Sequence, residues 1–161
     1  MRDLVTVVGY VNLVGFVLLG AIGLRQWRSR RDSAAAWVAL TFGALAFVVL
    51  AARLVPKHPH AFWELALQRV DIAVLVLFPY LLFRFTMAFG DPPRQLYRFV
   101  SAMSVALVVW TFALPHIPAS DEKRPAVFTA YLVVFLVHWT ILSVASAWLL
   151  WSAGRQQPTV A

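Results

Sequence analysis

The sequence predicts an all-α integral membrane protein, a bundle of five transmembrane helices with the N-terminus outside and the C-terminus in the cytoplasm. Hydrophobic residues make up 61% of the 161 residues and charged residues only 13%. The mean hydropathy is +0.76, and five long apolar stretches alternate with short polar segments. A soluble domain of this size could not cover so much apolar surface, and a helical crossing needs about 20 apolar residues. The stretches are continuously apolar, whereas the strands of a membrane barrel alternate every second residue.

Each crossing follows from one apolar stretch. The crossings are expected at residues 4–24, 34–54, 65–85, 96–114 and 127–151, so that residues 1–151 form one transmembrane domain and 152–161 a cytoplasmic tail or linker. The first stretch is not a signal peptide, because its strong positive charge follows the apolar segment instead of preceding it. Gly90, Pro92 and Pro93 end the third crossing in a tight turn. Ser120, followed by two acidic residues, predicts a capped start of the fifth helix.

The basic residues set the predicted orientation. Alternating crossings place eight arginines on one side, namely Arg25, Arg28, Arg30, Arg31, Arg84, Arg94, Arg98 and Arg155. The other side has five basic residues, namely Arg2, Arg53, Lys57, Lys123 and Arg124. The positive-inside rule then places the first side in the cytoplasm. The net charge of +7 is explained by this topology and by attraction to anionic lipid, so the lipid bilayer is the expected partner and nucleic acid is not.

The third crossing contains the most concentrated polar group of the membrane region. Glu64, Gln68 and Asp71 are spaced by four and then three residues, which places them on one face of a helix, and Arg69 lies nearby on another face. Ionisable groups within a bilayer are costly and usually have a task or a partner. These four residues are therefore the candidate ligand or proton site, open to the outside. The alternative is that Asp71 and Arg69 pair with neighbouring helices or extend toward the membrane surface.

Two further polar residues lie within predicted crossings. Asn12 in the first crossing and His138 in the fifth are candidate interhelix contacts, since side-chain amides and imidazoles bond across membrane helices. A haem would need a second axial ligand at the depth of His138, and the other histidines fall in outer loops. His58 and His60 in a proline-containing loop lack a defined metal geometry. The sequence therefore predicts no metal site and no cofactor. It also has no phosphate loop or nucleophile elbow, so an enzyme is not expected.

The stretch Arg69-Val-Asp-Ile-Ala-Val-Leu-Val-Leu-Phe-Pro-Tyr-Leu-Leu-Phe-Arg84, among tandem helices with short loops and an outside N-terminus, resembles the N-terminal membrane input region of bacterial sensor histidine kinases and diguanylate cyclases. The use of arginine, alanine and valine resembles actinobacterial examples. The resemblance covers nearly the whole chain and implies a cytoplasmic output module, often joined through a PAS or GAF domain. It contains no diagnostic motif, and no site residue is transferred from it.

The leading functional hypothesis is therefore a membrane-embedded sensory or anchoring domain of a signal-transduction protein in the cytoplasmic membrane. It would relay an outer or bilayer stimulus to a cytoplasmic signalling module that follows residue 161, with a homo-oligomer as a further partner. Asp71 and Arg69 are the expected stimulus contacts. The alternatives are a small permease or transporter with a proton or cation site at Asp71, and a structural subunit of a larger membrane complex.

Overall fold

The computed structural model describes the backbone of residues 2–56, 58–90, 92–118 and 121–156, and the side chains of residues 7–155 within those ranges. The described residues form five helices and no strand. Each helix is long and apolar enough to span a membrane. In chain order they are α1 (Arg2–Arg30), α2 (Ser33–Leu54), α3 (Phe62–Thr86), α4 (Arg94–Ala113) and α5 (Ala126–Gln156).

The helix boundaries have local causes. Arg31 has a positive φ of 53°, which lets the chain reverse sharply between α1 and α2. Asp32 then caps α2, because its carboxylate accepts a hydrogen bond of 3.0 Å from the backbone N–H of Ala34. At the start of α3, Glu64 accepts bonds of 2.9 and 3.1 Å from the N–H groups of His60 and Ala61. This is the backward-reaching half of a capping box.

Three boundaries differ from the sequence-based expectation. The fifth crossing was expected to end at residue 151, with a tail or linker over residues 152–161, but α5 continues to Gln156, and residues 157–161 lie outside the described residues. The first crossing was expected to end at residue 24, but α1 continues to Arg30. Arginine is a good helix former, so a helix can extend beyond its apolar part into water. The fifth helix was expected to begin near Ser120, which lies outside the described residues. Residues 121–125 are not helical, and α5 begins at Ala126, directly after Pro125. Proline is tolerated at the start of a helix but not inside it, and it disfavours the helical conformation for the residue before it, so the helix begins after Pro125.

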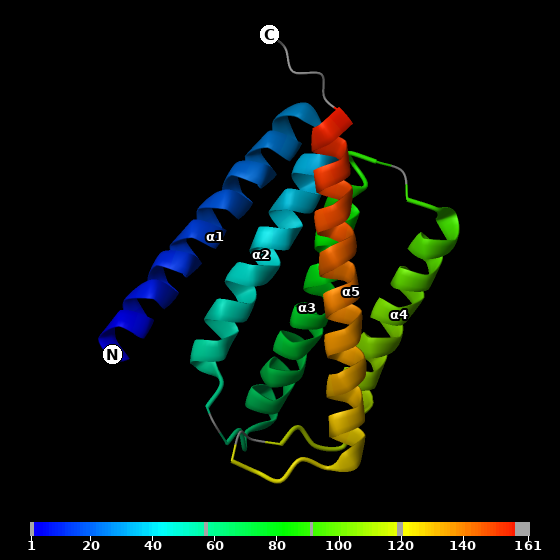
Figure 1. Cartoon of the computed structure of the whole chain (residues 1–161). Helices are drawn as coiled ribbons and strands as arrows, with labels where there is room; N and C mark the ends of the chain where they lie inside the picture. The colour runs from blue at the N-terminus through cyan, green and yellow to red at the C-terminus, as the bar shows by residue number, and fades with distance from the viewer. Residues whose placement is uncertain (1, 57, 91, 119–120, 157–161) are drawn as a thin grey trace.

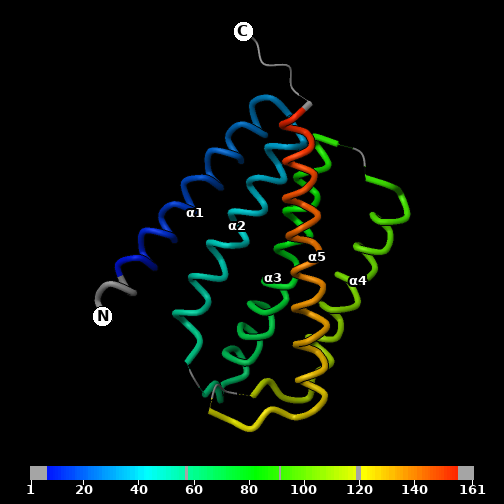
Figure 2. Tube along the Cα trace, viewed as in Figure 1, coloured from blue at the N-terminus to red at the C-terminus, as the bar shows by residue number. Residues whose placement is uncertain are grey.

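The bundle has α3 at its centre (Figure 1). This helix contacts α2, α4 and α5, whereas within the described residues α1 packs on α2 alone. The tube in Figure 2 shows that α1 and α2 diverge toward the N-terminal end of α1. In the same view α4 and α5 diverge toward the opposite end of the bundle. We call that opposite end, where α1 and α3 end and α2 and α4 begin, the arginine-rich end. The end that carries the α2–α3 and α4–α5 loops is the histidine end.

The best-packed core lies among α3, α4 and α5. One cluster of buried side chains lies toward the histidine end and is formed by Val76, Leu107, Leu114, Phe128 and Tyr131. A second lies toward the arginine-rich end and is formed by Phe83, Val100 and Leu142. The contact between α1 and α2 depends instead on small residues. A Cβ atom on Gly23 would lie 3.0 Å from the backbone N of Ala39, so glycine permits this close approach.

Candidate functional site

The structure divides the four predicted site residues among different roles. Glu64 is used by the start of its own helix, through its two bonds to backbone N–H groups. Gln68 is half-buried and has no side-chain hydrogen bond to another described residue. The helical spacing keeps Glu64, Gln68 and Asp71 on one face of α3. No direct bond joins any two of these three side chains in the described part of the chain.

Arg69 links α3 to the end of α4. Its Nη1 donates a hydrogen bond of 2.7 Å to the carbonyl oxygen of Phe112, and its Nη2 donates one of 2.9 Å to that of Leu114. The last carbonyls of a helix have no partner within the helix, and a cation is favoured there by the helix dipole. The planar guanidinium supplies two donors in the fixed geometry that two neighbouring carbonyls require. Arg69 therefore terminates α4 and fixes its position against α3.

Asp71 has an unsatisfied oxygen within the membrane region. Its Oδ1 is buried and has no hydrogen-bond partner among the described residues. The residue lies nine positions after the start of α3 at Phe62, about 13 Å along the helix axis at 1.5 Å per residue. Buried polar atoms without partners are rare, and an ionisable side chain within a membrane is by default a hypothesis for a functional site. The oxygen therefore has lone pairs that no described residue uses.

Two hydrogen-bonded pairs join α4 to α5 inside the bundle. Ser104 Oγ lies 3.1 Å from His138 Nε2, and both residues are buried. Thr111 Oγ1 lies 2.8 Å from the hydroxyl of Tyr131, again with both residues buried. Of these four, only His138 was a candidate from the sequence. Ser104 and Thr111 are seven residues apart, which places both on one face of α4. This spacing is the sequence signal from which a polar face of α4 could have been predicted.

Arg84 is a functional candidate that the sequence did not single out. It entered the sequence analysis as one of the eight arginines expected on the cytoplasmic side. Its guanidinium carbon lies 4.6 Å from the centre of the Trp37 ring and 5.1 Å from that of Tyr97. Rings from α2 and α4 thus contact one cation on α3 at the arginine-rich end. Arg84 Nε is buried and makes no hydrogen bond to a described residue. Cation–π contacts of this kind are worth about 0.5–2 kcal/mol each, more when water is excluded.

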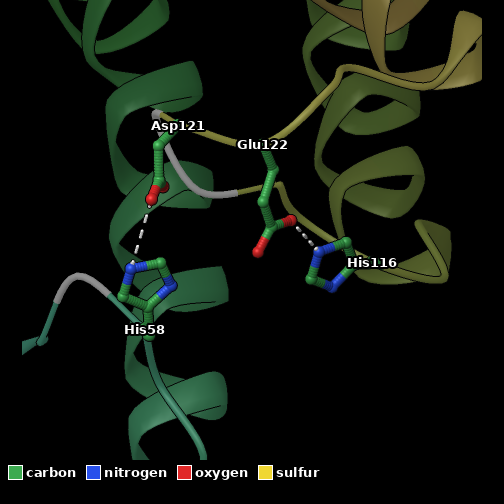
Figure 3. Close-up of polar contacts among 4 residues, drawn as sticks. All are labelled: His58, His116, Asp121 and Glu122. Carbon is green, nitrogen blue, oxygen red and sulfur yellow. Dashed lines mark hydrogen bonds and ion pairs between the residues drawn. The ribbon is translucent and has the colours of Figure 1, made fainter.

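One imidazole–carboxylate pair joins the two loops of the histidine end, and a second lies within the α4–α5 loop (Figure 3). His58 Nε2 in the α2–α3 loop lies 3.6 Å from Asp121 Oδ2 in the α4–α5 loop. His116 Nε2 lies 2.7 Å from Glu122 Oε2 within the second loop. The acidic residues that suggested a helix start therefore face histidines instead. Within the described ranges, no group of three or more His, Cys, Asp or Glu side chains could hold a metal ion.

Asn12 lies on the exposed surface of α1. It makes no hydrogen bond within the described part of the chain, so the expected bond to a neighbouring helix is not formed inside this bundle. The cause is the arrangement of α1, which among the described helices packs on α2 alone and leaves most of its described side chains uncovered. A different contact holds this part of α1, because the guanidinium carbon of Arg53 lies 3.8 Å from the centre of the Tyr10 ring.

These features define the class of protein. The chain is all-helical and has the character of a multi-pass membrane protein, with polar contacts concentrated on the central helix α3 and between α4 and α5. No protein-family model, no curated protein and no solved structure matches it.

Proposed function

We propose that this chain is a membrane-embedded sensory or anchoring domain of a bacterial signal-transduction protein, with Asp71 as the group that receives the stimulus. The observation that supports it is the buried Oδ1 of Asp71, which has no partner among the described residues. It lies on α3, the helix that contacts α2, α4 and α5. A ligand, ion or proton bound there would change the free energy of the packing of α3 against three helices at once.

The proposed orientation places the arginine-rich end in the cytoplasm and the N-terminus outside. Eight basic residues against five support it by the positive-inside rule. Asp71 then lies in the outer half of the membrane, where a stimulus could arrive from outside. The C-terminal end of α5 lies on the cytoplasmic side, where it could act on a signalling module.

The proposed relay uses the contacts around Asp71. Arg69, two residues away, joins α3 to the carbonyls of Phe112 and Leu114 at the end of α4. The pairs of Ser104 with His138 and of Thr111 with Tyr131 join α4 to α5. A stimulus that binds one arrangement of these helices better than another shifts the population between the two. The ends of α4 and α5, which diverge at the arginine-rich end (Figure 1), would then change their separation.

The test is a spin-label distance measurement across the arginine-rich end. The chain contains no cysteine, so Arg94→Cys on α4 and Arg155→Cys on α5, both exposed, can be labelled without removing native thiols. The labelled protein in nanodiscs is compared in acidic and alkaline buffer, and in sodium against choline chloride. We expect one of these changes to shift the distance distribution. Asp71→Asn should abolish the shift.

Asp32→Asn is the matched control, because it makes the same chemical change at the opposite end and asparagine caps a helix as well as aspartate does. This variant should retain the shift. A shift that persists unchanged in Asp71→Asn would remove Asp71 from the proposed role.

A small permease is the second proposal, and one observation favours it. The two polar pairs lie seven residues apart along both α4 and α5, so polar groups continue from Thr111 and Tyr131, near the end of α4, toward the middle of the bundle. In that case proteoliposomes should show proton or cation flux that Asp71→Asn and His138→Phe both abolish. Absence of flux in the wild-type protein, together with an Asp71-dependent distance shift, would favour the sensory proposal.

A further inference from the structure

The surface of α1 and α2 contains an apolar groove in the half of the bundle nearest the arginine-rich end. Its volume is about 450 Å³. From α1 it is lined by Val17, Ala21 and Leu24, and from α2 by Ala36, Leu40 and Gly43, among other residues. None of these side chains carries a polar group. Val17 and Leu40 in its lining are exposed, so the groove opens on the outer surface of the bundle.

A second apolar groove of about 300 Å³ lies between α2 and α3. It shares Ala39, Leu40 and Gly43 with the first groove. Leu40, one of the shared residues, is 53% exposed. Two apolar grooves that meet at the same residues of α2 offer room for the two acyl chains of one phospholipid.

The arginines at one end of the first groove supply the charge complementarity. Residues 17, 21, 24 and 28 are spaced by four, three and four, so Arg28 continues the groove-lining stripe of α1 by one turn. Arg25 and Arg28 line a hollow that shares Ala21 and Leu24 with the groove. The apolar groove therefore runs directly into a site lined by two guanidinium groups.

A third arginine is held at the same place. Trp27 lines the groove, and the guanidinium carbon of Arg31 lies 5.9 Å from the centre of its ring. The acidic residue at this turn is Asp32, whose carboxylate accepts the bond from Ala34 that caps α2. Three cations against one carboxylate favour an anionic group, and arginine binds phosphate through two parallel hydrogen bonds.

We propose that the α1–α2 groove is a binding site for an anionic phospholipid of the surrounding bilayer. One acyl chain occupies the groove between α1 and α2, the second crosses Leu40 into the groove between α2 and α3, and the headgroup phosphate contacts Arg25, Arg28 and Arg31. The headgroup contacts lie on α1 and the α1–α2 turn, the α3 residues that line the second groove (Val74, Leu77 and Leu81) do not include Asp71, and the site does not depend on the proposed sensory function.

The test is native mass spectrometry of the detergent-purified protein with phosphatidylglycerol and with phosphatidylcholine. We expect one phosphatidylglycerol to be retained in preference to phosphatidylcholine. Arg28→Gln should lower that preference about five-fold, the effect of one basic residue near an anionic headgroup. Arg98→Gln is the matched control, since Arg98 is an exposed arginine of α4 at the same end, and it should leave the preference unchanged.

The acyl-chain part of the proposal is tested by a separate pair of variants, one inside the groove and one outside it. A Cβ atom on Gly43 would meet nothing within 4 Å, so a side chain can enter the groove from this position, and Gly43→Leu should reduce retention of both lipids. Gly15→Leu makes the same change in open space on α1, outside the groove lining, and should not. Leu40→Trp, at an exposed position, provides a second filling variant. Equal losses of preference in Arg28→Gln and Arg98→Gln, or unchanged retention in both filling variants, would overturn the proposal.

Discussion

The Nη2 atom of Arg69 donates a hydrogen bond of 2.9 Å to the carbonyl oxygen of Leu114, across 45 residues of sequence. Leu114 follows the last residue of α4 and is itself buried. Together with the bond from Nη1 to Phe112, this contact fixes the end of α4 against α3. A cationic side chain within the membrane region thus has a structural partner in the helix backbone.

Replacing Arg69 with leucine should destabilise the protein. The substitution leaves the carbonyls of Phe112 and Leu114 without their donor, and a hydrogen bond to a charged group is worth about 1.5–3 kcal/mol. We expect the free energy of unfolding in mixed micelles to fall by about that amount. Arg69→Lys should recover only part of the loss, because one ammonium group lacks the planar pair of donors. Arg98→Leu, at an exposed position, is the control and should change stability by less than about 0.5 kcal/mol.

The buried pair of Ser104 and His138 is predicted to be weakly coupled. Hydrogen bonds between membrane helices average about 0.6 kcal/mol in double-mutant cycles, with a maximum near 1.7 kcal/mol. Ser104→Ala, His138→Phe and the double variant should therefore give a coupling energy in that range, measured by unfolding in mixed micelles. A coupling of zero would mean that the 3.1 Å contact does not contribute to stability.

The sequence predicted the positions of the five helices better than it predicted the hydrogen-bond partners of their polar side chains. Five apolar stretches were enough to place five helices, because length and hydropathy alone determine whether a segment can span a bilayer. The role of Arg69 was not accessible in the same way, since its acceptors are backbone carbonyls that every residue carries. The signal that existed was Pro115, which follows the end of α4 and leaves carbonyls there in need of a donor.

The role of Glu64 and the loop contacts show a second limit. Glu64 was grouped with Asp71 by helical spacing, but its position three residues after Ala61 also suits a capping box, and the structure uses it there. The acidic residues at 121 and 122 suggested a helix start, but they face histidines in the loops. For residues 121 and 122 the local sequence supports a helix start and a loop contact equally. Only the packing of the two loops decides which of the two forms.

Arg84 should couple α2 to α4 through its two aromatic contacts. Trp37→Leu and Tyr97→Leu each remove one ring from the guanidinium, and each contact is worth about 0.5–2 kcal/mol. In an Arg84→Leu background the same two substitutions should cost less, because the cation that attracts the rings is absent. Unfolding in mixed micelles measures each difference. Equal costs in both backgrounds would show that the rings contribute by packing alone.

The contact between His58 and Asp121 should restrain the two loops of the histidine end. His58 Nε2 lies 3.6 Å from Asp121 Oδ2, and both side chains are well exposed, so the contact contributes little to global stability and acts locally. Hydrogen exchange of the loop amides should therefore be faster in His58→Gln than in the wild type, measured in the same buffer. His60→Gln, in the same loop, is the control and should exchange as the wild type does. Equal exchange in His58→Gln and the wild type would show that the contact does not restrain the loops.

Asn12 is predicted to promote association between copies of the chain. It is exposed on α1, which packs on α2 alone among the described helices, and an amide facing lipid gains free energy by bonding to another helix. Val11→Cys, at a neighbouring exposed position, should form disulfide-linked dimers in membranes under oxidising conditions. Adding Asn12→Leu should reduce the dimer yield several-fold, whereas adding Leu19→Ala, another exposed position of α1, should not. If the yield is the same with and without the amide, Asn12 does not hold two copies together.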